Sequence, residues 1–364
     1  MKRNYPNNLE WNVVHARKSW HRKLVSRLKK KNRNRAKLGL TAFEIPSRRK
    51  FDFKSCRHLD VPEVMNFRDA YDDTVKFIRY IFQQVVVKKR YVLLHFEKCR
   101  EISTAACVVL AAEVFRCERL RPYHINGKYP LSEDVHAALS DIGFYKLINV
   151  VEHMAVSDDP DRYIVKLQTG KRGQPQLIDT IKKLLFGDVI KLTEKQLGNQ
   201  LYRGLTEAML NVHHHAYPDD IQRTDWLVDQ WWMTGHRDYR KREVQFLFYD
   251  QGVGIPHTLP KKWPEIVNSM ARLVGAGVTS ADLIEKATEI GQTSTKKQGR
   301  GRGLNDLRRL IENETGGELR LLSGNGEYIY SANGESKKKN RTDSLDGTLV
   351  VWTIRNSEML EWVE

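Results

Sequence analysis

A predicted strand that ends on an acid and two glycines limits the folds open to this chain more than any other segment. Residues Glu243–Tyr249 (EVQFLFY) alternate and are rich in aromatic side chains, which predicts a strand. Asp250 follows directly, with Gly252 and Gly254 two and four residues later. A strand end holds the carboxylate on a rigid edge, and the glycines allow a tight turn and the close approach of a flat ligand. Ordinary turns carry the same pattern, but a calcium loop does not fit, because apolar residues stand where further oxygen ligands would be needed.

A second segment, Leu201–Pro218, has the period of an amphipathic helix. Its apolar side chains recur at steps of three and four residues, which predicts one buried stripe. Glu207, Asn211 and His215 are spaced four residues apart and therefore project from one face of the helix. An acid, an amide and an imidazole on one face indicate either a solvated surface or a functional site.

A third segment is rich in glycine and leads into a predicted helix at Leu304–Ile311. Gly299, Gly301 and Gly303 precede that helix, so backbone N–H groups and the helix dipole can point at an anion. The spacing matches neither a Walker A loop nor a dinucleotide-binding strand–turn–helix. The polar loop before these glycines is typical of a lid. Farther on, Thr348 places a hydroxyl at the start of a predicted strand. Outside these motifs, the pattern predicts helices at Leu177–Leu201, Ile266–Val274 and Ala281–Glu289 and a basic turn at Gly334–Arg341.

Together, these motifs resemble the GHKL ATPase superfamily, which includes gyrase B, the heat-shock chaperone and histidine kinases. The resemblance covers about residues 177–355 and rests on the order of the motifs. That order is Glu207 to Asn211, then Asp250 to Gly254, then the three glycines, then Gly347-Thr348. It implies the Bergerat fold, a mixed sheet layered with helices, and it implies ATP and Mg²⁺ as ligands.

The resemblance also implies a role for each matching residue. Asn211 would coordinate Mg²⁺, and Glu207 would be the general base that orients water. Asp250 would accept a hydrogen bond from the adenine amino group, supported by Thr348. The remaining positions would line the nucleotide: Gly252 and Gly254 at the base, and His214, Gly299, Gly301 and Gly303 at the phosphates.

Residues 51–150 have the pattern of a smaller α/β unit. Its strand–helix order, with a helix that starts on Ser103-Thr104-Ala105, resembles the STAS domain of anti-sigma-factor antagonists. In that family a phosphorylatable Ser begins this helix, and Thr104 or Ala105 matches it here. The predicted helices of this unit are Phe67–Val87, Ser103–Leu120 and Leu131–Leu139, and the predicted strands are Tyr91–Phe96 and Tyr123–Ile125.

The net charge of +16 is concentrated near the N-terminus. Residues 1–50 hold 16 Lys and Arg side chains and two acids, Glu10 and Glu44. Such a polycation can bind a nucleic acid or an acidic protein surface, but a solvated arm without a partner has the same composition. The 4 Cys form no C-x-x-C pair, and no run of about 18 apolar residues is present. We therefore expect reduced thiols and a cytoplasmic protein without a membrane span.

The sequence thus predicts an α/β protein with five parts: a basic arm (1–50), a STAS-like domain (51–150), a connecting segment (151–200), a GHKL-type ATP-binding domain (201–356) and a tail (357–364). Three functions stay open. The first is an ATPase or ATP-driven switch with a regulatory or defence-like role. The second is a Ser/Thr protein kinase of the anti-sigma-factor type. The third is a nucleic-acid-binding module gated by ATP. Because many members of the superfamily dimerise, the resemblance also implies a homodimer.

Overall fold

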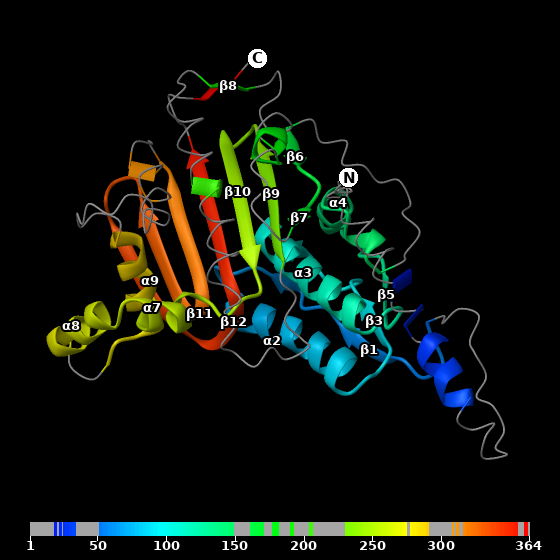
Figure 1. Ribbon diagram of the computed structural model, residues 1–364. Helices are drawn as coiled ribbons and strands as arrows, with labels where there is room; N and C mark the ends of the chain where they lie inside the picture. The colour runs from blue at the N-terminus through cyan, green and yellow to red at the C-terminus, as the bar shows by residue number, and fades with distance from the viewer. Residues whose placement is uncertain are drawn as a thin grey trace, which may run out of the picture.

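The structure is a computed structural model that combines parallel and antiparallel sheets with helices, which confirms the predicted α/β class (Figure 1). It describes residues 18–19, 22–23, 25–33, 51–148, 161–170, 177–181, 190–192, 204–206, 230–274, 277–290, 308, 311–312, 316–355 and 360–362. Within these ranges, no helix is long and apolar enough to cross a membrane.

The first part of the chain folds around a small parallel sheet. Its strand order is β1 (Arg57–Asp60), β3 (Val92–His95) and β5 (Ile125–Lys128). A separate parallel pair joins β2 (Val64–Met65) to β4 (Glu101–Ile102). The helical elements of this part are α2 (Tyr71–Phe82), a π-helical turn (Gln83–Val87), α3 (Thr104–Leu120), α4 (Glu133–Asp141) and a 3-10 turn (Phe144–Lys146). All five elements predicted here from the sequence are present, with shifted ends.

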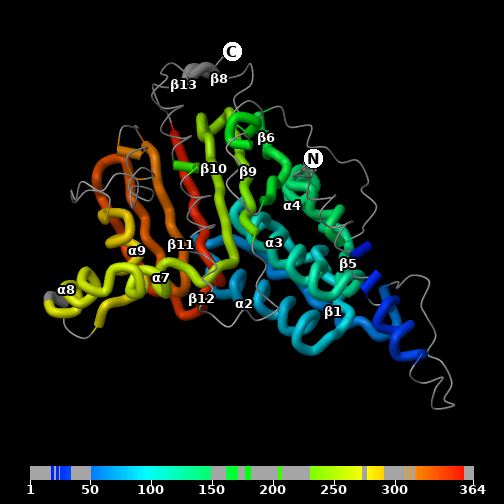
Figure 2. Tube along the Cα trace, viewed as in Figure 1, coloured from blue at the N-terminus to red at the C-terminus, as the bar shows by residue number. Residues whose placement is uncertain are grey.

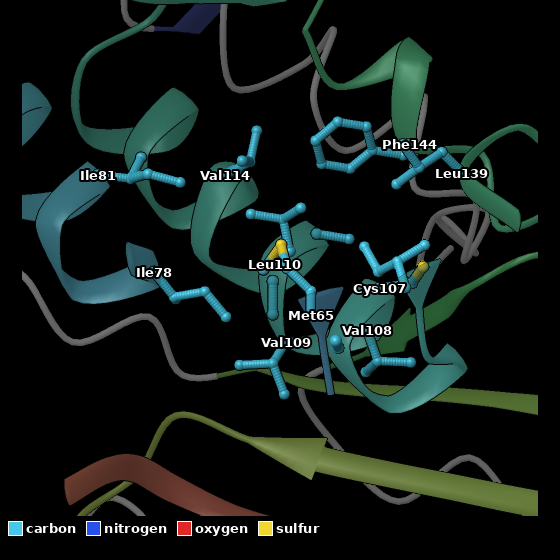
Figure 3. Close-up of a cluster of buried hydrophobic side chains, with 14 of the residues drawn as sticks. Met65, Ile78, Ile81, Cys107, Val108, Val109, Leu110, Val114, Leu139 and Phe144 are labelled. Atoms are coloured by element: carbon cyan, nitrogen blue, oxygen red, sulfur yellow. The ribbon is translucent and has the colours of Figure 1, made fainter. Parts of the chain in front are cut away.

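Helix α3 is the centre of the first core. Most of its residues are buried, because its many Ala and Val side chains let neighbouring elements approach closely. Figure 3 shows its side chains packed against Ile78 and Ile81 of α2 on one side and against Phe144 on the other. Ser103 caps the helix, since its Oγ accepts a hydrogen bond from Ala106 N at 3.2 Å. Thr104, the match to the STAS phosphoacceptor, is only 5% exposed.

The second part is built on a larger sheet of six strands. Along the sheet the order is β11, β12, β10, β9 and β6, and β7 also pairs with β9. Every pairing that the structure describes in this sheet is antiparallel. The strands span Arg162–Ile164 (β6), Gln168–Gly170 (β7), Trp231–Asp238 (β9), Glu243–Asp250 (β10), Glu318–Ser331 (β11) and Ser336–Arg355 (β12). Helices α7 (Ile255–Lys262), α8 (Pro264–Val274) and α9 (Ser280–Glu289) follow β10 in the chain.

The two faces of the larger sheet pack in two different hydrophobic clusters. Leu247 and Tyr249 point to the face covered by α2 and α3, and they join the hydrophobic cluster of the first part. Phe246 and Phe248 point to the opposite face and pack in a second cluster that includes Ile284 of α9. Alternate residues of β10 therefore face different clusters. Since the first cluster contains side chains of the first part's helices together with side chains of the large sheet, these two parts of the chain share one hydrophobic core.

Two predicted elements are wrong. The helix predicted at Leu177–Leu201 starts as expected at residues 177–181, but Ile190–Leu192 is a strand, β8, that pairs with β13 (Leu360–Trp362) (Figure 2). Its partner comes from the far end of the chain, so no local pattern revealed it. The basic turn predicted at Gly334–Arg341 is mostly strand, since β12 already begins at Ser336.

The physical reason for the second error is charge pairing between β12 and α9. Lys338 lies in β12, and its Nζ contacts the carboxylates of Asp282 and Glu285 on α9 at 2.8 and 2.7 Å. Lysine-rich sequence was therefore mistaken for a loop although α9 supports it as a strand. The sequence patterns did not predict helix α7 or the strands β1, β2, β4, β7 and β9. They did predict strand β10 and the helices α8 and α9.

Candidate functional site

Asp250 lies at the end of β10, on the side of the large sheet that faces the second cluster. Its register partners are Thr348 on β12 and Trp231 on β9. The residue is 6% exposed, and its Oδ1 accepts a hydrogen bond from the Gly252 N–H at 2.8 Å. The structure thus brings Asp250, Gly252 and Thr348 together, although β12 is far from β10 in the sequence.

The electrostatic setting of Asp250 is unusual for a carboxyl group. Burial raises its pKa from 3.8 to about 7, and backbone N–H groups of Gly252 and Thr348 limit the rise by favouring the ionised form. No cationic side chain among the described residues contributes to this pKa. In its ionised form, which prevails above pH 7, the group is therefore a buried hydrogen-bond acceptor suited to a neutral donor such as an amino group.

Two glycines with positive φ hold the backbone around this carboxylate. Gly254 has φ +81° and immediately precedes α7; a Cβ there would lie 2.7 Å from Ser323 Oγ. Gly347 has φ +82°, and a Cβ there would lie 1.9 Å from the Asp250 carbonyl oxygen. The close neighbours of both glycines belong to the protein itself, so packing between strands accounts for them without a ligand.

Ser323 of β11 is part of this arrangement and was missed in the sequence. Its Oγ donates to the Gly347 carbonyl at 2.8 Å, accepts from Ile255 N at 2.9 Å and lies 3.0 Å from Thr348 Oγ1. One hydroxyl therefore ties β11, β12 and the start of α7 together. The signal that could have found it is Ser followed by Gly inside a strand, since the register of β11 shifts there.

The remaining predicted site residues lie outside the described part of the chain. These are Glu207, Asn211, His214, Gly299, Gly301 and Gly303. Residues next to two of those segments are described. Leu205 and Ile311 are fully buried in the second cluster together with Phe248, which precedes Asp250 by two residues. The chain just before Glu207 and the chain after the glycine-rich segment thus pack on the face that carries Asp250.

A polar group lies on the opposite face, directly behind Asp250, and all of its members except the exposed Asp346 are buried. Gln251 donates from Nε2 to Glu113 Oε2 of α3 at 2.9 Å. Glu113 in turn pairs with Arg116, and Arg116 contacts Asp346, one residue before Gly347. Sequence reasoning missed this group, because its members come from three separate segments and their contact depends on the tertiary fold.

Among the described residues, no group of three or more His, Cys, Asp or Glu side chains could hold a metal ion, and all four cysteines are free thiols. The chain matches no protein-family model and no curated protein sequence.

Proposed function

We propose that this chain is a Mg²⁺-dependent ATP-binding protein of the GHKL type in which Asp250 recognises adenine. The observation that carries the proposal is the buried Asp250 carboxylate at a strand end, held by the Gly252 N–H beside Thr348. Such a group accepts a hydrogen bond from the adenine amino group. Guanine presents a carbonyl oxygen at the corresponding position, and two facing acceptors repel each other.

The phosphate side of the site is assigned through the resemblance. Asn211 would hold Mg²⁺, which neutralises phosphate charge when bound, and Glu207 would orient a water molecule. His214 and the three glycines Gly299, Gly301 and Gly303 would surround the phosphates. The burial of Leu205 and Ile311 in the same cluster as Phe248 supports this assignment, since it keeps the chain before Glu207 and the chain after Gly303 on the Asp250 face.

The proposal extends to the role of ATP. We favour hydrolysis, or a switch between two conformations driven by ATP, in a cytoplasmic regulator that forms homodimers. A protein kinase that phosphorylates its own STAS-like part is less compatible with the burial of Thr104, because the hydroxyl would have to leave the core to reach a phosphate donor.

One observation favours nucleic-acid binding as a second function. Residues 25–33 form a helical stretch whose basic side chains are exposed to solvent. These are Arg27, Lys29, Lys30, Lys31 and Arg33. A helix with this charge can neutralise several phosphates of a nucleic acid, which makes binding depend strongly on salt.

Replacement of Glu207 tests the hydrolytic assignment. We expect Glu207→Ala to retain ATP affinity within about threefold and to lower steady-state phosphate release by about 100-fold or more, since it removes only the general base. Binding is measured by calorimetry and turnover by phosphate release. As a control, Glu289→Ala removes an acid from the surface of α9 and should change neither quantity. Turnover that persists in Glu207→Ala would exclude Glu207 as the base.

Three assays separate the proposed function from its competitors. Steady-state phosphate release indicates an ATPase, whereas transfer of label from γ-labelled ATP to protein indicates a kinase. Salt-dependent binding of DNA or RNA that is lost when residues 1–40 are deleted indicates the nucleic-acid module.

A further inference from the structure

We infer that Glu113 of α3 is a positioning residue for the Asp250 site and that it couples ATP binding to the STAS-like part of the chain. This inference rests on the proposed function, because it concerns the same site. The residues that carry it are Gln251, Glu113, Arg116 and Asp346, which we call the linking group.

The linking group contacts both strands that form the site. Gln251 directly follows Asp250, and its side-chain amide donates to Glu113 at 2.9 Å. On the second strand, Asp346 stands two residues before Thr348, and its carboxylate contacts Arg116 at 3.2 Å. Through Glu113 and Arg116, a single helix therefore contacts the end of β10 and the middle of β12.

Burial strengthens the contacts among Gln251, Glu113 and Arg116, whereas the Asp346 side chain is 47% exposed and its ion pair with Arg116 is correspondingly weaker. The side chains of Glu113 and Arg116 are 3% and 7% exposed, and the Arg116 guanidinium contacts the Glu113 carboxylate at 2.7 Å. Burial raises the pKa of Glu113, and Arg116 opposes that rise. Hydrogen bonds among buried charged groups are stronger than those in water. Removal of one partner leaves a buried polar atom without a hydrogen bond, which lowers the stability of the folded protein.

Further contacts hold α3 in a fixed position relative to β10 and β12. The Tyr249 hydroxyl, one residue before Asp250, donates to the Asp346 carbonyl at 2.8 Å. The Arg116 guanidinium also stacks on the ring of Phe82, 4.3 Å from its centroid. A displacement of α3 would therefore move Gln251 and Asp346 together and shift the Asp250–Thr348 pair. The converse also holds, because coupling between two sites is reciprocal.

The experiment measures ATP affinity and amide hydrogen exchange on the full chain. Gln251→Leu keeps the volume of the side chain but removes the donor to Glu113, and we expect ATP to bind about 10-fold more weakly. Glu113→Gln keeps an acceptor for Gln251 and should retain most of the affinity. Gln245→Leu is the matched control, because Gln245 lies within β10, which Gln251 directly follows, but bonds to Glu243 instead.

Hydrogen exchange supplies the readout that a purely structural role would not change. In the wild type, ATP should slow the exchange of the α3 amides (residues 104–120), and Gln251→Leu should abolish that protection while Gln245→Leu preserves it. ATP binding without any protection of α3, or equal affinities for Gln251→Leu and Gln245→Leu, would overturn the inference and leave the proposed function standing. Failure of the wild type to bind ATP would instead overturn the proposed function, and the inference with it.

Discussion

Asp250→Asn is expected to weaken ATP binding by more than about 100-fold, beyond the range of ordinary titration. The substitution keeps the size of the side chain but replaces an acceptor oxygen by an amide donor, which faces the donor of the adenine amino group. Because Asp250 is buried at the strand end, the group cannot swing into solvent to avoid this contact. Calorimetric titration with ATP in the presence of Mg²⁺ measures the effect.

The same substitution should stabilise the folded protein at neutral pH. The pKa of Asp250 rises from 3.8 to about 7 on folding, so the native state keeps a proton that the unfolded chain releases between pH 4 and 7. The stability of the wild type therefore falls as the pH rises through that window, by about 4 kcal/mol in total. Asn carries no charge and avoids this loss. We expect the stability of Asp250→Asn relative to the wild type to increase by about 2–3 kcal/mol between pH 5 and pH 8 in urea unfolding.

The combination of these two effects is diagnostic. A variant that loses ATP binding while gaining stability cannot have lost binding through misfolding. If Asp250→Asn binds ATP with unchanged affinity, Asp250 does not contact the base. If instead its stability relative to the wild type does not depend on pH, the carboxyl is not buried in the way described.

Gly347→Ala should cause the largest loss of stability among single methyl additions at the site. A Cβ at position 347 would lie 1.9 Å from the Asp250 carbonyl oxygen, and φ is +82°. The added methyl must push β12 away from β10, so we expect a loss of more than about 3 kcal/mol in the free energy of unfolding. Because the displaced strand carries Thr348, ATP affinity should fall as well.

Gly334→Ala provides the matched control for this substitution. Gly334 has φ +84° in the turn between β11 and β12, and no atom lies within 4 Å of a Cβ built there. Only the conformational penalty remains, so we expect a loss of about 1 kcal/mol and unchanged ATP affinity. Equal losses for the two variants in urea unfolding would show that the contact between Gly347 and Asp250 is not close.

The fold was predictable from sequence where a pattern is local. The helix Ser103–Leu120 and the strand Glu243–Tyr249 carry their own periods and end signals, and both are present with at most small changes at their ends. Strand β8 was mistaken for helix because its partner lies at the other end of the chain. Charged residues of β12 were mistaken for a turn because their support comes from α9.

The candidate site was predictable to a similar degree. Asp250 and Thr348 were selected from their places in two separate motifs, and the structure makes them cross-strand partners. The linking group was not found, because a single buried Glu gives no signal in the sequence. Ser323 was not found either, although the Ser-Gly pair inside a strand marks its position. Their role depends on two faces of one strand contacting different elements, which only the tertiary structure defines.

The most direct test of the account is a calorimetric titration of the wild-type chain with ATP and, in parallel, with GTP, both with Mg²⁺. Recognition of the adenine amino group by Asp250 predicts saturable binding of one ATP per chain and affinity for GTP at least about 100-fold weaker. Absence of ATP binding, or equal affinity for ATP and GTP, would contradict the central claim that the end of β10 is an adenine site.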